Sequence, residues 1–169
     1  HLEELLATED REPVILELSS WLIDSLTHIE RGPDIAVLTN IYEDHLDRYE
    51  NDFELYKQSK AALFIRQTEG QIAVLNYDHE VVREVAETVK SKKYWFSSSP
   101  LPDGLEGAYI SDEQIVVDIN GEKTVVMPVS EIKLKGEHNV SNALAAAIVS
   151  VVAKEQIPTE MVAESLREF

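Results

Sequence analysis

The 169 residues fit one domain or slightly more, and 44% hydrophobic with 28% charged residues is the composition of a globular protein. A net charge of −17 disfavours nucleic acid and anionic membrane as partners, because both attract clustered Lys and Arg. The absence of cysteine excludes a disulfide framework and a thiolate metal site, and the longest apolar run, 143–153, is too short to span a bilayer. We therefore expect a soluble, cytoplasmic protein with no nucleic-acid or membrane partner.

Four short apolar runs in the first hundred residues are typical of strands buried on both faces. They lie at 14–16, 35–38, 72–76 and 93–97. Helical patterns separate the later runs: Asp52 can cap a helix that ends near Arg66, and Asp78 can cap one that ends near Val89. Because strands that alternate with helices pair in parallel, we predict an α/β fold with a mostly parallel sheet flanked by helices.

The pattern changes after Pro102. Three β-type runs follow at 107–111, 114–119 and 123–127, and Asn120-Gly121 is a strong signal for a type I′ hairpin between the last two. They predict a small antiparallel sheet, within about 105–135, attached to the parallel one. Two helices are expected after it, at 138–154 and 158–168, and Pro158 suits the first turn of the second.

Carboxylates follow the first two predicted strands, at the end where ligands collect in open parallel sheets. Glu17 ends the first strand and could hold Mg²⁺, which prefers oxygen ligands, or could be a solvated acid. The loop 40–47 puts three carboxylates and a histidine directly after the second strand. Taken alone it is equally well a metal-binding loop or an acidic surface loop. Its matching position beside Glu17 favours a functional site.

Lys60 lies on the apolar face of the helix that Asp52 begins, whereas Lys57 is offset from that face and is expected to be solvated. The same face carries four larger apolar side chains: Phe53, Tyr56, Leu63 and Phe64. A lysine in this position either extends its ammonium to water or reaches a partly desolvated site in which its pKa falls. A neutral amine can react with carbon dioxide to form a carbamate, which is an anionic oxygen ligand for a metal.

The start of the penultimate helix, Gly136-Glu137-His138-Asn139-Val140-Ser141-Asn142, carries two amides on one face, because Asn139 and Asn142 are three residues apart. A primary amide offers a donor and an acceptor together, which matches the edge of adenine. Ordinary capping by Asn and Ser is the alternative, and it explains one of these residues more easily than all of them.

Five segments in order along nearly the whole chain are similar to motifs of the Mur ligases. Glu17-Leu18-Ser19-Ser20-Trp21-Leu22 resembles the ELSSFQL segment of the D-glutamate-adding branch. Residues 40–47 resemble the NxxxDHLD loop, and 56–60 resemble the YxxxK helix. Residues 76–78 resemble the NxDD turn, and 136–142 resemble the GxHNxxN helix start. The branch rests mainly on 18–21, because the diaminopimelate- or lysine-adding branch typically carries a histidine after the paired serines. Asp24 and Trp21 are mild departures from the family pattern.

The resemblance implies a role for each matching residue. Glu17 would bind the Mg²⁺ that bridges the β- and γ-phosphates of ATP, and His45 with carbamylated Lys60 would hold a second Mg²⁺ near the γ-phosphate. His138, Asn139 and Asn142 would bind ATP, the two amides at its adenine; Ser19 would lie near the muramoyl substrate, in a cleft lined by Asn40 and Asp44. In such ligases ATP phosphorylates the carboxylate of the substrate, here UDP-N-acetylmuramoyl-L-alanine, and the amine of D-glutamate attacks the acyl phosphate.

One family motif is missing: none of the six glycines is followed by Lys-Ser or Lys-Thr, so the phosphate-binding G-x-x-G-K-[ST] loop is absent. We expect residues 1–169 to be part of a Mur ligase central domain, without the N-terminal UDP-binding domain and the C-terminal domain. On this interpretation the fragment has no ligase activity and at best weak ATP affinity, because the β- and γ-phosphates lose their N–H donors. The loss of neighbouring strands would expose sheet edges and favour self-association.

Two other interpretations remain open at this stage. The parent protein is a different Mur ligase or an enzyme similar to folylpolyglutamate synthase, or the chain is a non-catalytic α/β interaction domain that keeps the fold without the loop. The substrate of the full-length parent separates the first from our interpretation, and an upstream GKS or GKT motif in the reading frame would exclude the second.

Overall fold

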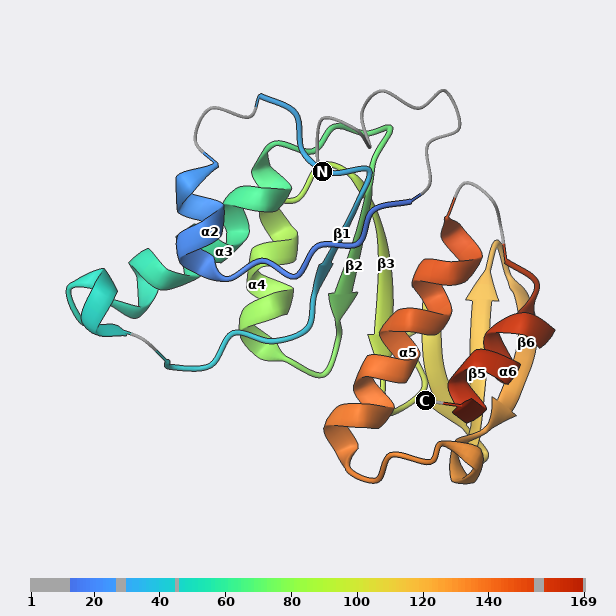
Figure 1. Ribbon diagram of the computed structural model, residues 1–169. Helices are drawn as coiled ribbons and strands as arrows, with labels where there is room; N and C mark the ends of the chain where they lie inside the picture. Colours follow the sequence, from blue (N-terminus) through green and yellow to red (C-terminus); the bar gives the residue numbers. More distant parts are fainter. Residues whose placement is uncertain (1–12, 27–29, 45, 154–156, 169) are drawn as a thin grey trace.

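The computed structural model describes residues 13–26, 30–44, 46–153 and 157–168, and its strands form one six-stranded sheet in the order of the sequence (Figure 1). The predicted runs at 35–38, 72–76, 93–97, 107–111, 114–119 and 123–127 are all confirmed within a residue. The strands are β1 (Ile35–Leu38), β2 (Ile72–Asn76), β3 (Lys92–Ser97), β4 (Gly107–Ser111), β5 (Gln114–Ile119) and β6 (Glu122–Pro128).

The antiparallel strands continue the parallel sheet. β1, β2, β3 and β4 pair in parallel, and β4, β5 and β6 pair antiparallel, so β4 joins the two halves. The predicted hairpin turn is confirmed, with positive φ at both Asn120 (54°) and Gly121 (77°), as a type I′ turn requires. The β4–β5 turn uses Asp112 and Glu113 at positive φ instead, and without a glycine it carries no strong sequence signal.

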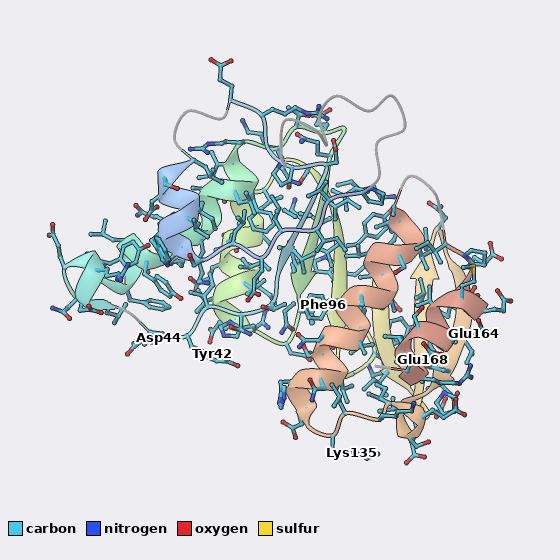
Figure 2. The ribbon with its side chains drawn as sticks, viewed as in Figure 1. Tyr42, Asp44, Phe96, Lys135, Glu164 and Glu168 are labelled. Atoms are coloured by element: carbon cyan, nitrogen blue, oxygen red, sulfur yellow. The ribbon has the colours of Figure 1, made fainter. Side chains whose placement is uncertain are left out.

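Helices cover both faces of the sheet (Figure 1). α3 and α4 pack on one face around Trp95, whereas α5 and α6 pack on the other, around Phe96, which Figure 2 places against α5. The helices are α2 (Ser20–Ser25), α3 (Phe53–Ile65), α4 (Glu80–Thr88), α5 (Glu137–Val152) and α6 (Thr159–Glu168), with 3₁₀ turns η1 (Leu46–Tyr49) and η2 (Val129–Glu131). No helix in the described part of the chain is long and apolar enough to cross a membrane.

The strand predicted at 14–16 is wrong. This segment belongs to no helix or strand, pairs with none of the described strands, and leaves the side chain of Ile15 93% exposed. An apolar run becomes a buried strand only when a neighbour satisfies its backbone, and none of the described residues does so. The outer edge of β1 is likewise unpaired among these residues, which is the feature behind the expectation of self-association.

Of the two predicted helix caps, one is confirmed and one is wrong. The Asp52 carboxylate accepts hydrogen bonds from the backbone N–H groups of Glu54 and Leu55 at the start of α3. The Asp78 carboxylate does not cap α4. It accepts instead from Ser97 Oγ (2.6 Å) and from the backbone N–H (2.7 Å) and hydroxyl (2.8 Å) of Ser98, and so ties the turn after β2 to the end of β3.

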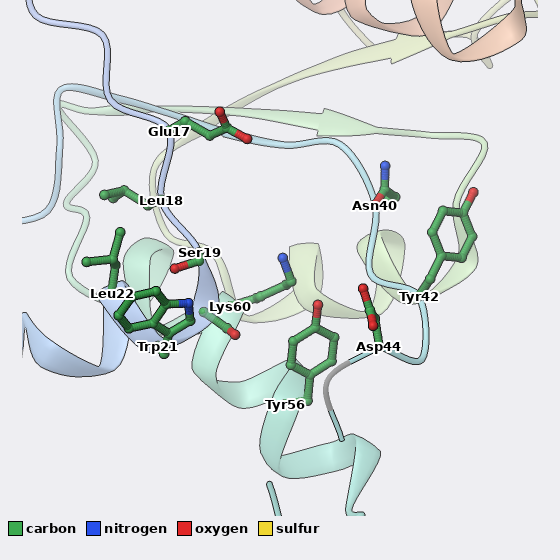
Figure 3. A pocket seen from close by; sticks show the side chains of 11 residues that line it. Glu17, Leu18, Ser19, Trp21, Leu22, Asn40, Tyr42, Asp44, Tyr56 and Lys60 are labelled. Atoms are coloured by element: carbon green, nitrogen blue, oxygen red, sulfur yellow. The ribbon is translucent and has the colours of Figure 1, made fainter. Parts of the chain in front are cut away.

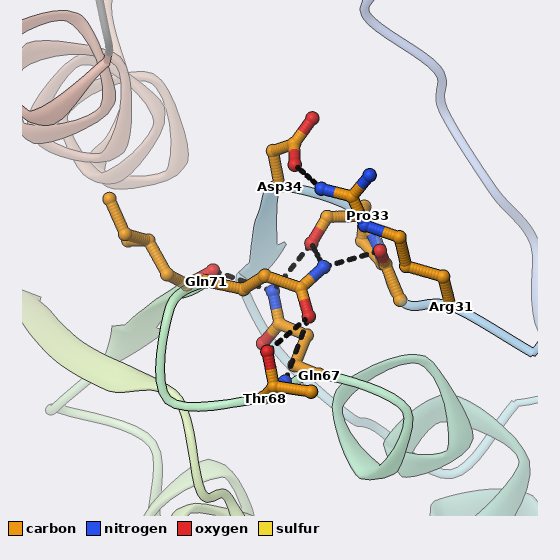
Figure 4. A network of polar contacts seen from close by, with 8 residues as sticks. Arg31, Pro33, Asp34, Gln67, Thr68 and Gln71 are labelled. Carbon is orange, nitrogen blue, oxygen red and sulfur yellow. Dashed lines mark hydrogen bonds and ion pairs between the residues drawn. The ribbon is translucent and has the colours of Figure 1, made fainter.

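A buried amide network holds the amino ends of β1 and β2 together (Figure 4). Gln71 Nε2 donates to the carbonyl oxygens of Gly32 and Pro33, and its Oε1 accepts from Thr68 N at 2.8 Å. Gln67 Nε2 donates to the Pro33 and Ile72 carbonyls. Both glutamines are buried, so their amides replace the water that these backbone groups would otherwise need.

Gln71→Leu is expected to lower the free energy of unfolding by about 2 kcal/mol, because it leaves the Gly32 carbonyl and the Thr68 N–H group without their partner. The Pro33 carbonyl keeps its hydrogen bond from Gln67 Nε2. Urea unfolding of the purified chain measures this as a lower midpoint at an unchanged m-value. Gln58→Leu is the control, because Gln58 is exposed on α3 and should shift the midpoint little. Equal midpoints for the two variants would show that the network does not stabilise the fold.

Candidate functional site

A pocket of about 440 Å³ opens at the carboxyl ends of the first strands, between the segment before α2, the loop after β1, and α3 (Figure 3). It gathers polar side chains from all three segments. Those that line it include Glu17, Ser19, Asn40, Asp44, Tyr56 and Lys60. The structure thus brings together five of the nine residues singled out in the sequence. His45 is outside the described residues.

A polar cluster joins α2 to α3 and so sets Glu17 and Ser19 opposite Lys60. Ser59 Oγ lies 2.6 Å from Asp24 Oδ1 and 3.0 Å from the Ser20 carbonyl oxygen. The Tyr49 hydroxyl donates to Asp24 Oδ2 at 2.9 Å. Ser59 is buried on α3, one residue before Lys60, so this cluster fixes one wall of the pocket against the other. Sequence analysis predicted neither α2 nor this cluster.

The Lys60 amine is in a partly desolvated position. Its side chain is half-buried, and Nζ lies 5.3 Å from the centre of the Tyr56 ring. Burial lowers the pKa of Lys60, and electrostatic interactions with Tyr49 and Asp44 only partly oppose that effect. The geometry therefore matches the second of the two alternatives left open for this lysine.

Lys57, one turn earlier on α3, has the opposite environment. Its Nζ lies 2.7 Å from Glu54 Oε1 and 3.1 Å from Glu84 Oε2, and the first of these contacts is the main reason its pKa is raised. The prediction that Lys57 is solvated is wrong, because only 18% of its side chain is exposed. The ion pairs link α3 to α4 and keep this amine charged.

The pocket offers oxygen atoms that suit a hard cation or a phosphorylated ligand. Glu17 and Asp44 contribute carboxylates, and Ser19 Oγ is buried with no hydrogen-bond partner among the described residues. A buried hydroxyl without a partner costs free energy, which a bound polar ligand would recover. In the described part of the chain no three His, Asp or Glu side chains gather as a metal site, so a further oxygen ligand would have to come from elsewhere.

The residues expected to bind ATP lie outside this pocket. His138, Asn139 and Asn142 stand at the start of α5, which lies at the same edge of the sheet as the ends of β1, β2 and β3 (Figure 1). His138 and Asn142 are exposed. Asn139 Nδ2 donates to the Lys135 carbonyl at 3.0 Å, so this amide ties the turn before α5 to the helix.

Tyr42 is a pocket residue that sequence analysis missed. It is 65% exposed, and its ring meets the ring of His79 edge to face, with centroids 4.9 Å apart (Figure 3 shows Tyr42 beside Asn40 and Asp44). Its loop is also held by Asn76, whose Nδ2 donates to the Thr39 carbonyl at 2.8 Å. A large aromatic side chain directly before the acidic residues of this loop is the signal that could have identified it.

The fold and the pocket define a class: an α/β domain that collects carboxylate, amide and amine groups at the carboxyl ends of parallel strands. Residues 2–150 match the model of the Mur ligase middle domain. The chain belongs to the Mur ligase family.

Curated relatives match nearly all of the chain. It is 37% identical over 168 residues to UDP-N-acetylmuramoylalanine–D-glutamate ligase of Salinibacter ruber, covering 98% of this chain and 35% of that protein. For the ligase of the same name from Christiangramia forsetii the identity is 38% over 168 residues, covering 98% and 36%. The chain thus spans about a third of the length of these relatives.

Solved structures support the fold. A UDP-N-acetylmuramoyl-L-alanyl-D-glutamate–2,6-diaminopimelate ligase superposes with a TM-score of 0.66 at 21% identity, covering 90% of this chain and 31% of that one. The Acinetobacter baumannii ligase MurF superposes with a TM-score of 0.59 at 17% identity, covering 80% and 29%. At these identities the likeness concerns the fold alone.

Proposed function

We propose that this chain is the middle domain of an ATP-dependent amide ligase that adds D-glutamate to UDP-N-acetylmuramoyl-L-alanine in peptidoglycan synthesis. The observation that carries the proposal is the pocket: the segments similar to the family's motifs, distant in sequence, supply Glu17, Asp44 and Lys60 to one cavity. Relatives named for this reaction are 32–38% identical to the chain over at least 163 residues, and these alignments cover 96–99% of it. This similarity favours the D-glutamate-adding branch over other ligases.

ATP and Mg²⁺ suit this pocket. Glu17 and Asp44 supply the oxygen atoms that Mg²⁺ prefers, and Ser19 Oγ supplies a hydroxyl that lacks a partner. ATP would supply the phosphoryl group that converts the substrate carboxylate into an acyl phosphate, which the D-glutamate amine attacks. The lowered pKa of Lys60 raises the fraction of neutral amine available to form a carbamate, and with His45 that carbamate would hold a second Mg²⁺.

Substrate positioning would come from the pocket walls. Asn40, Asp44 and Ser19 would orient the muramoyl substrate, and His138 with the Asn139 and Asn142 amides at the start of α5 would hold ATP at the same edge of the sheet. Holding two reactants and the transferring phosphoryl group in line is the main catalytic contribution of such a site.

A ligase that carries this middle domain is expected to release phosphate from ATP with UDP-N-acetylmuramoyl-L-alanine and D-glutamate. L-lysine, diaminopimelate and folate substrates should give less than about one hundredth of that rate, because a site that pairs with a substrate's polar groups rejects analogues strongly. A preference for any of these other substrates would assign the parent to a different ligase.

A polypeptide of these 169 residues alone is expected to form no amide and to bind ATP weakly, because its sequence has no Gly followed by Lys-Ser or Lys-Thr. Calorimetric titration with ATP and Mg²⁺, together with the same phosphate assay, measures both. Turnover by this polypeptide would contradict that part of the proposal.

A further inference from the structure

The turn after β2, residues 76–79, contacts both neighbouring strand ends at the pocket edge of the sheet. Asn76 Nδ2 donates to the Thr39 carbonyl in the loop after β1, and Asp78 accepts from Ser97 and Ser98 after β3. Asn76 Oδ1 also accepts from Asp78 N at 2.9 Å, which makes the turn itself rigid. Whatever this turn touches is therefore held relative to the sheet.

His79 closes this turn, and its ring contacts the loop after β1. It stands at the N-cap of α4, yet it makes no capping hydrogen bond. Its Nδ1 is buried and has no hydrogen-bond partner among the described residues. The ring packs instead against Tyr42, at 4.9 Å between centroids and 65° between planes. The His79 ring thus makes no capping hydrogen bond, leaves a buried nitrogen without a partner, and packs against one aromatic side chain. This arrangement calls for an explanation.

We propose that His79 is a positioning residue for the pocket: its ring supports Tyr42, and through Tyr42 it helps to hold Asn40 and Asp44 at the pocket wall. Tyr42 lies between these two residues in sequence, and all three line the cavity. The start of the loop is held by the hydrogen bond from Asn76 to Thr39 and by Ile41, which is buried in the core, and the His79 contact adds a support at Tyr42. This support acts on the shape of the pocket. Only its effect on catalysis rests on the proposed function.

The charge state of the ring decides whether this support persists. Burial, and secondarily the charge of Arg83 on α4, lower the pKa of His79 below its ordinary value of 6.5. Among the described residues, the groups that act on the ring are the Arg83 charge and, from the loop, the Tyr42 ring. The neutral form therefore predominates at pH 6.5 and above. As the pH falls through the lowered pKa, the ring gains a charge beside Arg83, and the contact weakens.

The test uses NMR of the purified chain with ¹³C-labelled tyrosine rings, recorded from pH 8 to pH 5. We expect the Tyr42 signals of the unsubstituted chain to shift with a midpoint below 6.5. In His79→Phe the ring contact is kept, so Tyr42 should retain its high-pH shift and lose the titration. In His79→Ala the signals should move toward those of an exposed tyrosine, and amide hydrogen exchange at 40–44 should rise about three- to tenfold.

Two controls separate this proposal from a general loss of stability. Glu87→Ala, at an exposed position on α4, should change neither the Tyr42 signals nor the exchange at 40–44. Tyr109 on β4 should keep its signals in every variant if the fold is intact. Identical Tyr42 spectra for His79→Ala and the unsubstituted chain would overturn the proposal, as would an unaltered titration in His79→Phe. Because no nucleotide or substrate is present, failure of the proposed ligase function would leave these results unchanged.

Discussion

Replacing Lys60 by alanine in a ligase that carries this domain is expected to lower kcat at least about a hundredfold. The amine is half-buried in the pocket, its pKa is lowered by burial, and Asp44 and Tyr56 line the same cavity. The expected loss follows from our proposal that the Lys60 side chain becomes an anionic ligand that neutralises charge on the transferring phosphoryl group. Steady-state kinetics with saturating ATP and both substrates measures the effect.

Lys57→Ala is the matched control, because Lys57 is on the same helix but forms ion pairs with Glu54 and Glu84 outside the pocket. It should leave kcat within about twofold, since it removes only partly exposed ion pairs. Lys60→Glu, which restores an anionic oxygen at a shorter reach, should recover part of the rate lost in Lys60→Ala. Wild-type activity in Lys60→Ala would exclude a catalytic role for this amine.

A second measurement examines the chemistry of Lys60 without turnover. When the purified chain is equilibrated with ¹³C-bicarbonate at pH 8, we expect a carbamate ¹³C signal that disappears in Lys60→Ala and persists in Lys57→Ala. The difference follows from the opposite pKa shifts of the two amines: burial lowers that of Lys60, whereas hydrogen bonds to Glu54 and Glu84 raise that of Lys57. A signal that survives in Lys60→Ala would place the carbamate elsewhere.

Much of the pocket was predictable because hydrophobic periodicity shows which face of a helix is buried, and the ends of parallel strands show which loops lie at one edge of the sheet. The helical spacing that predicts Lys60 on the apolar face of α3 agrees with its position in the pocket. The loop after β1 also lines the pocket, as expected for a loop at the carboxyl end of a parallel strand. Six strands and the helices α3, α4, α5 and α6 followed from the same two periods. These are local properties of the chain, and the fold preserved them.

The errors came from partners that are distant in sequence. Residues 14–16 have the composition of a buried strand, but a strand also needs a neighbour, and composition does not show one. Asp78 has the position of a helix cap, but Ser97 and Ser98, at and just after the end of β3, offer its carboxylate three hydrogen bonds. The Tyr42 ring packs against His79, which is 37 residues away. Local rules cannot rank such competing partners.

The junction between the two halves of the sheet depends on one glycine. Gly107 opens β4 and pairs with Trp95 on the parallel side and Asp118 on the antiparallel side. A Cβ added there would lie 1.8 Å from the Trp95 carbonyl oxygen and 2.7 Å from its carbonyl carbon. These are backbone atoms of a central strand, and Trp95 N itself donates to the Glu106 carbonyl at 2.9 Å. Neither strand can move aside without breaking the ladder.

Gly107→Ala is therefore expected to lower the free energy of unfolding by about 3 kcal/mol or more, at the upper end of the cost of overpacking. Gly70→Ala is the control, because a Cβ at Gly70 meets no atom within 4 Å, and its effect should stay within about 0.5 kcal/mol. Urea unfolding followed by far-UV circular dichroism compares the two midpoints. Equal urea midpoints for Gly107→Ala and Gly70→Ala would show that β4 does not approach β3 this closely. That result would contradict the pairing that makes the six strands one continuous sheet.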